Sequence, residues 1–353
     1  MITRYFKIDP VYPNIMVLKM GAEIIIEGGI VAFPTETVYG LGADGLNEDA
    51  LERIFFAKGR PMDNPLILHI SSIKNVRDVA SYVPLSAKKA MRAFWPGPLT
   101  VVLPKSYQIP DEVTAGLPTV AVRMPAHPLA LKLIKLARVP VAAPSANLSG
   151  RPSPTTGLHV LRDLKGKIEM IIDGGPARWG IESTVVDFTS DVPTILRPGA
   201  VTREMLEAVI GPVAFDKAIY DKESTPKSPG VKYIHYAPRG EMFLIKGEDR
   251  SKVTEKIRDL VKENQKLGKK VAVLASEETC IKMQKLSINP DYMASLGSTK
   301  KLEMVASRIY SLLRNCDKLG MDIILTEDFP EEGIGAAVMN RLIKACGHKI
   351  LKI

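Results

Sequence analysis

Hydrophobic and polar positions in residues 1–210 alternate between short β-branched runs and helical patterns. An asparagine, a preferred helix N-cap, precedes each of the first two helical patterns: Asn14 before a helix through Glu27, and Asn47 before a helix over 48–57. Apolar runs predict strands at 30–33, 66–70, 99–103, 119–124, 139–143, 168–172, 183–188 and 194–196, and periodic segments predict further helices at 128–137 and 202–210. This order of elements predicts an α/β or α+β layer domain.

The periodicity fails between Gly211 and Gly240, where lysine, serine, proline and glycine gather. Beyond this stretch, strands are predicted at 242–245, 270–274 and 322–325, and helices at 252–267, 302–315 and 334–346. Strands that alternate with helices favour a small, mainly parallel sheet. The sequence therefore predicts a first domain over 1–211, a linker over 212–240 and a C-terminal domain over 241–353.

Composition excludes several classes of protein. The 353 residues are 46% hydrophobic and 25% charged, which is typical of a packed globular protein and too apolar for a disordered one. No apolar run approaches the roughly 18 residues that cross a bilayer, and residues 1–10 lack a signal-peptide pattern. We therefore expect a cytoplasmic protein with no membrane partner.

Net charge, cysteine spacing and histidine spacing limit the ligands and metals that the protein is expected to bind. The net charge of +9 suits anionic partners such as nucleotides or RNA, but no concentrated basic block indicates stable tRNA binding. Cys280, Cys316 and Cys346 are widely spaced, so we expect core thiols instead of a disulfide framework. No two of the five histidines stand at ligand spacing, and we predict no metal held by the protein itself.

The segment Gly40-Leu-Gly-Ala-Asp-Gly45 matches the GxGxxG pattern of dinucleotide sites. In that fingerprint the glycines join a strand directly to a helix, whereas here 34–39 intervenes after the strand. We favour the simpler interpretation, in which the glycines permit a tight turn.

Two other segments carry candidate binding groups. Lys58 and Arg60 stand at a helix end, where both could reach one anion, although cations there also stabilise a helix C-terminus. Ser145 and Asn147 follow an apolar strand, where ligands often bind, although Ser-x-Asn is also a common turn.

Arg123, Ser183 and Arg197 stand beside apolar strands in the same way, and together they would form a local cationic basin. No P-loop, HExxH, GxSxG or EF-hand pattern occurs in the sequence. The motifs that usually identify P-loop ATPases, zinc proteases and serine hydrolases are therefore absent from it.

These segments together resemble the threonylcarbamoyl-AMP synthase family. The resemblance is carried, in the family's order, by Thr35-Glu-Thr-Val-Tyr-Gly-Leu41, Lys58-Gly-Arg60-Pro, Pro65-Leu66, Trp95-Pro-Gly-Pro-Leu-Thr100, Val122-Arg-Met-Pro125, Ala143-Pro-Ser-Ala-Asn-Leu-Ser-Gly150, Ser183-Thr-Val-Val186 and Leu196-Arg-Pro-Gly199. Ser228-Pro-Gly-Val-Lys-Tyr-Ile-His235-Tyr-Ala-Pro238 resembles the linker signature of the two-domain branch.

The resemblance implies a YrdC-type fold, a twisted mixed sheet with helices, followed by a smaller C-terminal α/β domain. It implies an enzyme, a nucleotidyltransferase that condenses L-threonine, bicarbonate and ATP to threonylcarbamoyl-AMP and pyrophosphate for the threonylcarbamoyladenosine modification of tRNA. Mg²⁺ is expected to arrive with ATP, no tightly bound organic cofactor is expected, and a downstream threonylcarbamoyl transferase complex is the expected protein partner.

The resemblance also implies roles for individual residues. Lys58 and Arg60 are expected at the polyphosphate, as the catalytic pair. The other residues expected around ATP are Thr119, Ser145, Asn147, Arg151, Arg197, His235 and Tyr236, and those expected around threonine are Thr35, His69, Arg123 and Ser183. In the family the linker lies across the catalytic cleft, so we predict that it acts as a lid.

Three alternatives stay open at this point. A basic protein with a YrdC-type concave surface could be an RNA-binding module, although it lacks basic residues interleaved with aromatic ones for stacking bases. An NAD(P) oxidoreductase would bind nicotinamide. A related carbamoyltransfer maturation factor would carry zinc-knuckle and acylphosphatase-like segments, which this sequence lacks.

Overall fold

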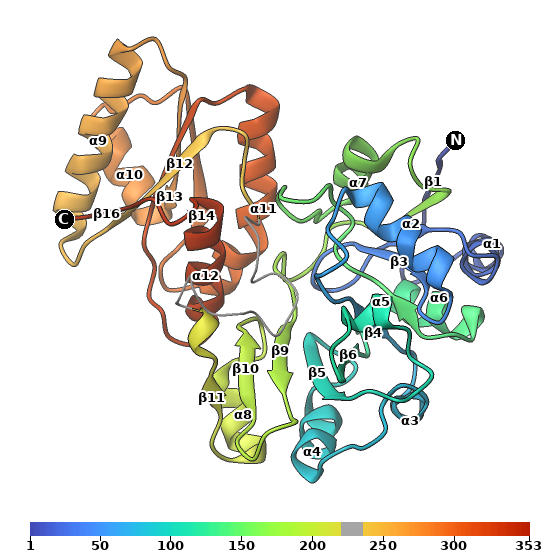
Figure 1. Ribbon diagram of the computed structural model, residues 1–353. Helices are drawn as coiled ribbons and strands as arrows, with labels where there is room; N and C mark the ends of the chain where they lie inside the picture. Colours follow the sequence, from blue (N-terminus) through green and yellow to red (C-terminus); the bar gives the residue numbers. More distant parts are fainter. Residues whose placement is uncertain (220–235) are drawn as a thin grey trace. The chain divides into compact units, whose positions relative to one another are not determined.

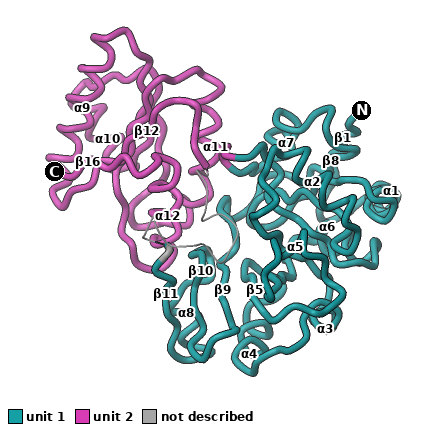
Figure 2. Tube along the Cα trace, viewed as in Figure 1, with its two compact units in different colours: residues 1–149, 153–233 teal, residues 150–152, 234–353 magenta. Residues whose placement is uncertain are grey.

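The computed structural model describes residues 1–219 and 236–353, and the chain divides into two compact units (Figure 2). Unit 1 comprises residues 1–149 and 153–233, and unit 2 comprises residues 150–152 and 234–353. The predicted linker over 212–240 contributes residues to both units, and its part from 220 to 235 lies outside the described residues. The limits of the three predicted domains stay a prediction.

Unit 1 is built on a mixed sheet of 11 strands (Figure 1). In spatial order the strands are β1 (Arg4–Lys7), β8 (Met170–Asp173), β2 (Val31–Phe33), β3 (Gly40–Asp44), β7 (Val141–Ala142), β4 (Ile67–His69), β6 (Thr119–Arg123), β5 (Leu99–Pro104), β9 (Thr184–Asp187), β10 (Thr194–Arg197) and β11 (Ala214–Phe215). Parallel and antiparallel pairs occur in the same sheet, as in β4 with β6 and β6 with β5. The predicted mixed sheet is confirmed.

Capping residues set several ends of the helices of unit 1. Asn14 and Asn47 accept backbone N–H bonds as N-caps, as predicted, and Gly59 ends α2 in the left-handed conformation at φ 61°. The helices are α1 (Ile15–Ile26), α2 (Glu48–Lys58), α3 (Val76–Val79), α4 (Leu85–Phe94), α5 (Asp111–Thr114), α6 (Pro128–Ala137), α7 (Gly157–Leu164) and α8 (Arg203–Ile210), with 3₁₀ turns at Ile73–Asn75 and Lys217–Ile219.

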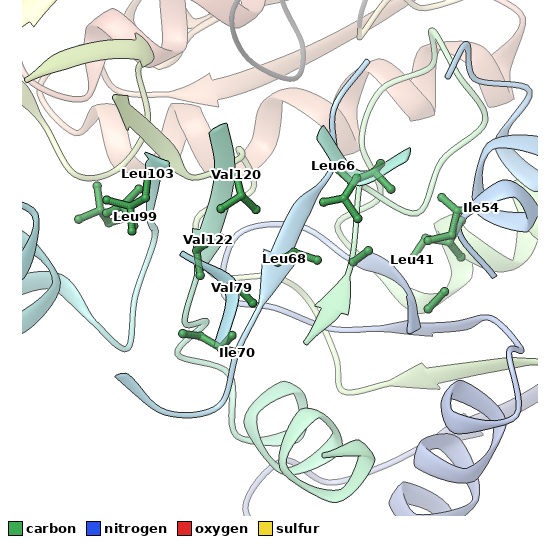
Figure 3. Packing of buried hydrophobic residues seen from close by; sticks show 14 of the residues in the cluster. Leu41, Ile54, Leu66, Leu68, Ile70, Val79, Leu99, Leu103, Val120 and Val122 are labelled. Carbon is green, nitrogen blue, oxygen red and sulfur yellow. The ribbon is translucent and has the colours of Figure 1, made fainter. Parts of the chain in front are cut away.

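Two hydrophobic layers pack on opposite faces of this sheet. The larger one includes Leu68, Val122 and Ile54 of α2 (Figure 3). On the other face, Phe33 and Val141 pack with α1 and α6. Because successive side chains of a strand point to opposite faces, β2, β7 and β8 contribute to both layers.

Gly40 and Gly42 lie on strand β3, and Gly45 lies in the turn that follows it, so the dinucleotide-loop interpretation is wrong and the tight-turn interpretation holds for Gly45 alone. Gly40 and Gly42 pair with Phe33 and Val31 of β2. A Cβ built on Gly42 would lie 2.6 Å from the ring of Phe33 and 2.8 Å from Val141. The glycines therefore leave room for side chains that cross β3 from the neighbouring strands.

Unit 2 is a five-stranded parallel sheet with helices on both faces. Its strands in spatial order are β14 (Tyr292–Gly297), β13 (Val271–Ser276), β15 (Ile323–Glu327), β12 (Glu241–Lys246) and β16 (Ile350–Lys352), and its helices are α9 (Arg250–Lys266), α10 (Glu277–Lys285), α11 (Leu302–Leu319) and α12 (Gly335–Ala345). The predicted smaller α/β unit with a parallel sheet is confirmed. All three cysteines are buried and free, as expected.

Replacing Gly42 by alanine should destabilise unit 1 by about 1–3 kcal/mol, because overpacking forces Phe33 and Val141 to move. Gly40→Ala is the matched control, since the nearest atom to its added methyl group lies at 3.3 Å. Urea unfolding followed by tryptophan fluorescence measures this, because both tryptophans, Trp95 and Trp179, belong to unit 1. Equal destabilisation by the two variants would contradict the explanation.

Candidate active site

Four predicted site residues, His69, Thr119, Arg123 and Arg197, lie on one face of the strands β4, β6 and β10. His69, Thr100 and Arg123 are register partners on neighbouring strands, so their side chains leave the sheet on the same side. Thr119 shares that side because it lies four residues before Arg123 on β6. Arg197 pairs with Val185 of β9, which pairs with Thr100. We call this side of the sheet the arginine face.

The floor of the arginine face is apolar. A small cluster of buried side chains, separate from the two larger layers, contributes one residue from each of five adjacent strands: Ile67, Ala121, Val102, Val185 and Leu196. The polar residues therefore stand around a surface that does not itself bind water strongly, which strengthens their electrostatic interactions.

A buried ion pair lies at one end of the arginine face. Arg123 donates to Glu36 across 2.7 Å, and the two side chains are 5% and 9% exposed. The second carboxylate oxygen of Glu36 accepts the backbone N–H of Ala126 at 3.0 Å, and Arg123 Nε donates to the carbonyl of Gly97 at 3.3 Å. The ion pair joins the loop after β2 to strand β6, and it brings Thr35 to this end of the face.

His69 stands beside this pair in its neutral form. Burial, together with the positive charge of Arg123, lowers the pKa of His69 to about 3. Its Nδ1 lies 3.1 Å from the carbonyl of Ile67, and its ring meets Phe33 edge to face at 6.4 Å between centroids. At neutral pH the His69 imidazole therefore carries no charge, and it can contribute hydrogen bonds and van der Waals contacts.

Ser183 and Arg197 form a second group at the same end. The Ser183 and Thr100 hydroxyls lie 2.8 Å apart, and Arg197 donates to both the hydroxyl and the carbonyl of Ser183 at 3.1 Å. All three side chains are buried. Sequence reasoning grouped Arg197 with ATP, whereas the structure brings it to Ser183, among the residues predicted for threonine.

Lys58 holds the Ser-x-Asn loop. It is the last residue of α2, but its ammonium group donates to the carbonyls of Ser145 and Asn147, the latter at 2.7 Å. The Lys58 carbonyl accepts the N–H of Ser149 at 2.9 Å, and the Ser145 hydroxyl donates to Asn147 Oδ1 at 2.5 Å. The structure thus brings Lys58 to Ser145 and Asn147, which lie 87 and 89 residues further along the chain.

Backbone bonds align this loop with β3. Ser145 forms a bridge with Gly40, and the carbonyl of Tyr39 accepts the N–H of Ala146 at 2.8 Å. Tyr39 is held in turn by Asp173, whose carboxylate accepts its hydroxyl at 2.7 Å and also accepts Tyr5. Although burial alone would raise it, these hydrogen bonds keep the pKa of Asp173 below its usual value.

Arg60 and Thr119 lie toward the same end as the Lys58 loop. Arg60 donates to the carbonyls of Asn64 and Pro65 at 3.0 Å, just before β4 begins. Thr119 begins β6, which runs parallel to β4. At about 3.3 Å per residue, Thr119 and Arg123 are separated by about 13 Å along the strand. Lys58, Arg60, Thr119, Ser145 and Asn147, all predicted for ATP, therefore lie toward one end of these strands, and the residues predicted for threonine lie toward the other end, together with Arg197.

The remaining predicted residues belong elsewhere. Arg151 lies in the short segment of unit 2 at 150–152, and Tyr236 lies in the same unit, buried and stacked on Tyr310 at 5.2 Å between ring centroids. His235 lies outside the described residues. Within unit 2, Arg341 also stands over the Tyr236 ring at 5.6 Å.

Sequence reasoning missed Glu36 and Thr100. Both lie inside motifs that carry the resemblance: Glu36 lies between Thr35 and Thr37, and Thr100 ends the segment that begins at Trp95. A signal for Glu36 was present, because a carboxylate between buried threonines must find a cationic partner. Its partner could not be chosen without the strand register.

Among residues 1–219 and 236–353, no group of three His, Cys, Asp or Glu side chains is placed to hold a metal ion. In the same part of the chain no helix has the length and apolarity to span a membrane.

Fold and site together define an α/β protein with a mixed sheet, one face of which carries two buried arginines. Comparisons with known proteins agree with this class. A family model described as "Telomere recombination" matches residues 23–199, and one described as "Threonylcarbamoyl-AMP synthase, C-terminal domain" matches residues 201–347.

Similar proteins span both units. The threonylcarbamoyl-AMP synthase of Pyrococcus abyssi is 50% identical over 337 residues, which covers 95% of this chain and 96% of that protein. The Bacillus subtilis protein of the same name is 47% identical and covers 98% and 97%. A crystal structure of P. abyssi Sua5 complexed with L-threonine superposes with a TM-score of 0.92 at 48% identity and covers 100% of both chains. This chain belongs to the threonylcarbamoyl-AMP synthase family, and the resemblance found in its motifs is confirmed.

The stability of unit 1 should fall as the pH drops below about 6.5. The pKa of His69 is lowered on folding, so the unfolded chain takes up the proton first, at a cost to the folded state of about 1.4 kcal/mol per pH unit down to about pH 3. In His69→Gln this part of the pH dependence should disappear, and in the control His348→Asn of unit 2 it should persist. Urea unfolding by tryptophan fluorescence at pH 7.5, 6 and 5 measures the slopes, and an unchanged slope in His69→Gln would contradict the assignment.

Proposed function

We propose that this protein condenses L-threonine, bicarbonate and ATP to threonylcarbamoyl-AMP and pyrophosphate, the activated intermediate for the threonylcarbamoyladenosine modification of tRNA. The observation that carries the proposal is the arginine face: two guanidinium groups and several hydroxyls surround an apolar floor, in a chain whose relatives are named for this activity. A related Sua5 crystallised with L-threonine supports the amino acid as one substrate.

The chemistry needs no nucleophile from the protein. The threonine amine attacks the carbon of bicarbonate, water leaves, and a carbamate forms. A carbamate oxygen then attacks the α-phosphorus of ATP, the bond to the bridging oxygen of the β-phosphate breaks, and pyrophosphate departs. Both reactants are anions, so the protein must position them and offset their repulsion.

We infer that threonine binds at the end of the face that holds the buried ion pair. Arg123 and Arg197 offer positive charge to its carboxylate, and Ser183, Thr35 and neutral His69 offer hydrogen bonds. Because Glu36 already takes one edge of Arg123, the guanidinium is fixed in orientation before the substrate arrives, which reduces the entropy lost on binding.

We infer that ATP binds toward the Lys58 loop. Arg60 faces the polyphosphate, while Lys58 acts mainly by holding the carbonyls of Ser145 and Asn147, which shapes the loop for the nucleotide. Thr119 and Arg151 are further candidates, with His235 and Tyr236 contributing from the linker. Mg²⁺ enters as part of the MgATP substrate, and no tightly bound organic cofactor takes part.

The product is a reactive mixed anhydride, so a downstream threonylcarbamoyl transferase is the expected partner that consumes it. The linker is proposed to shield the adenylate from water, since exclusion of water protects reactive intermediates.

Incubation of the protein with ATP, L-threonine and labelled bicarbonate should give pyrophosphate and a labelled adenylate in equal amounts, separated by chromatography. Omission of bicarbonate should stop pyrophosphate release, because the carbamate is the attacking group. Continued formation of an adenylate without bicarbonate, or salt-dependent RNA binding with no ATP binding, would overturn the proposal.

Lys58→Met should lower kcat/KM for ATP by about 100-fold, because small displacements of positioning groups cost rate on this scale. Lys135→Met is the matched control, since Lys135 is an exposed lysine in the last turn of α6. Steady-state pyrophosphate release, with threonine and ATP varied in turn, separates the two substrates. An equal loss in the control would show that the effect is not specific to the loop.

A further inference from the structure

Unit 2 contains a cavity of about 460 Å³ at the carboxyl edge of its parallel sheet. Its walls come from Ser276 at the end of β13, Asp328 just after β15, and the first turns of α9 and α10. From β13 the chain passes through α10 to β14 on one side, whereas from β15 it passes through α12 to β16 on the other. The cavity therefore lies where the strand order reverses, which is the usual place for a ligand in an open α/β sheet.

A buried carboxylate fixes the base of the cavity. Glu327, the last residue of β15, is fully buried and accepts the N–H of Ser276 at 2.7 Å and the hydroxyl of Thr279 at 3.0 Å. Arg250 contacts Glu327 at 3.4 Å and Asp328 at 2.8 Å. These bonds connect two strand ends with the starts of two helices, so the cavity is shaped before any ligand enters.

The charges of the lining argue against an anionic ligand. Each charged side chain there already has a protein partner: Arg250 pairs with Asp328, Lys282 donates to Ser251, and Glu278 accepts from Ser298. The positions that would take a phosphate are occupied by carboxylates, because Asp249 caps α9 and the first turn of α10 is acidic. A zwitterion would also find no unpaired charge to bind.

The remaining features fit a flat, uncharged ligand that donates hydrogen bonds. Phe329 and Pro330 form an apolar wall, and the Asp328 and Glu278 carboxylates offer acceptors beside it. The volume falls within the range of small-molecule sites. We propose that this cavity binds a ribonucleoside, with the base against Phe329 and Pro330 and the ribose diol donating to a carboxylate. This site is independent of the synthase reaction proposed for unit 1.

The test is calorimetric titration of the full-length protein with adenosine, guanosine, cytidine and uridine, and with the 2′-deoxy form of any that binds. At least one ribonucleoside should bind, and its deoxy form should bind about tenfold more weakly, which corresponds to about 1.4 kcal/mol for one lost hydrogen bond. Absence of binding by all four, or equal affinity of the deoxy form, overturns the proposal.

Substitutions in each unit test where the nucleoside binds. Thr299→Tyr fills the cavity without touching the Glu327 network and should abolish binding, whereas Thr299→Val keeps the space and should retain it. Asp328→Asn should weaken binding about tenfold. Lys58→Met, which changes the proposed ATP site, should leave nucleoside binding intact. If Lys58→Met instead lost nucleoside binding while Thr299→Tyr kept it, the ligand would belong to unit 1 and the proposal would be overturned. Thermal unfolding verifies that each variant folds, and unchanged pyrophosphate release in Thr299→Tyr keeps this test separate from that of the synthase.

Discussion

The arginine face depends on the burial of one guanidinium group. The Arg123 side chain is 5% exposed, and a charge removed from water to this degree is stable only if it is paired and hydrogen-bonded. Glu36 supplies the pair, and in doing so it fixes the loop after β2 against the end of β6. Loss of one partner would leave the other charge buried alone, which costs about 3–5 kcal/mol. The same contact that stabilises this part of unit 1 thus sets the direction in which Arg123 presents its positive charge.

The same segment after β2 also fixes the loop of Ser145 and Asn147. Tyr39, three residues after Glu36, is fixed by Asp173 through its hydroxyl and bonds the Ser-x-Asn loop through its backbone. Lys58 holds the far side of the same loop. A continuous segment after β2 therefore contacts residues proposed for both substrates. Under the proposed function, this segment would hold two mutually repelling anions at a fixed separation.

The sequence predicted the elements whose signals are local. Pro128 and the apolar spacing behind it place α6 at its observed limits, and the asparagine caps place α1 and α2. It failed at Gly40 and Gly42, because the reason for these glycines is Phe33 crossing from the next strand. Most residues of the arginine face and of the Lys58 loop were recognisable from motifs. The partners within that set were not, since Glu36 with Arg123 and Ser183 with Arg197 are determined by strand register over long separations in sequence.

The central claim is that both substrates lie along one face of the mixed sheet. The most direct measurement is a crystal structure of the protein with L-threonine and a non-hydrolysable ATP analogue bound together. The account predicts the threonine carboxylate within hydrogen-bond distance of Arg123 or Arg197, and the α-phosphate between that end of the face and the loop of Ser145 and Asn147. Either ligand bound on the opposite face of the sheet, or away from these side chains, would contradict it.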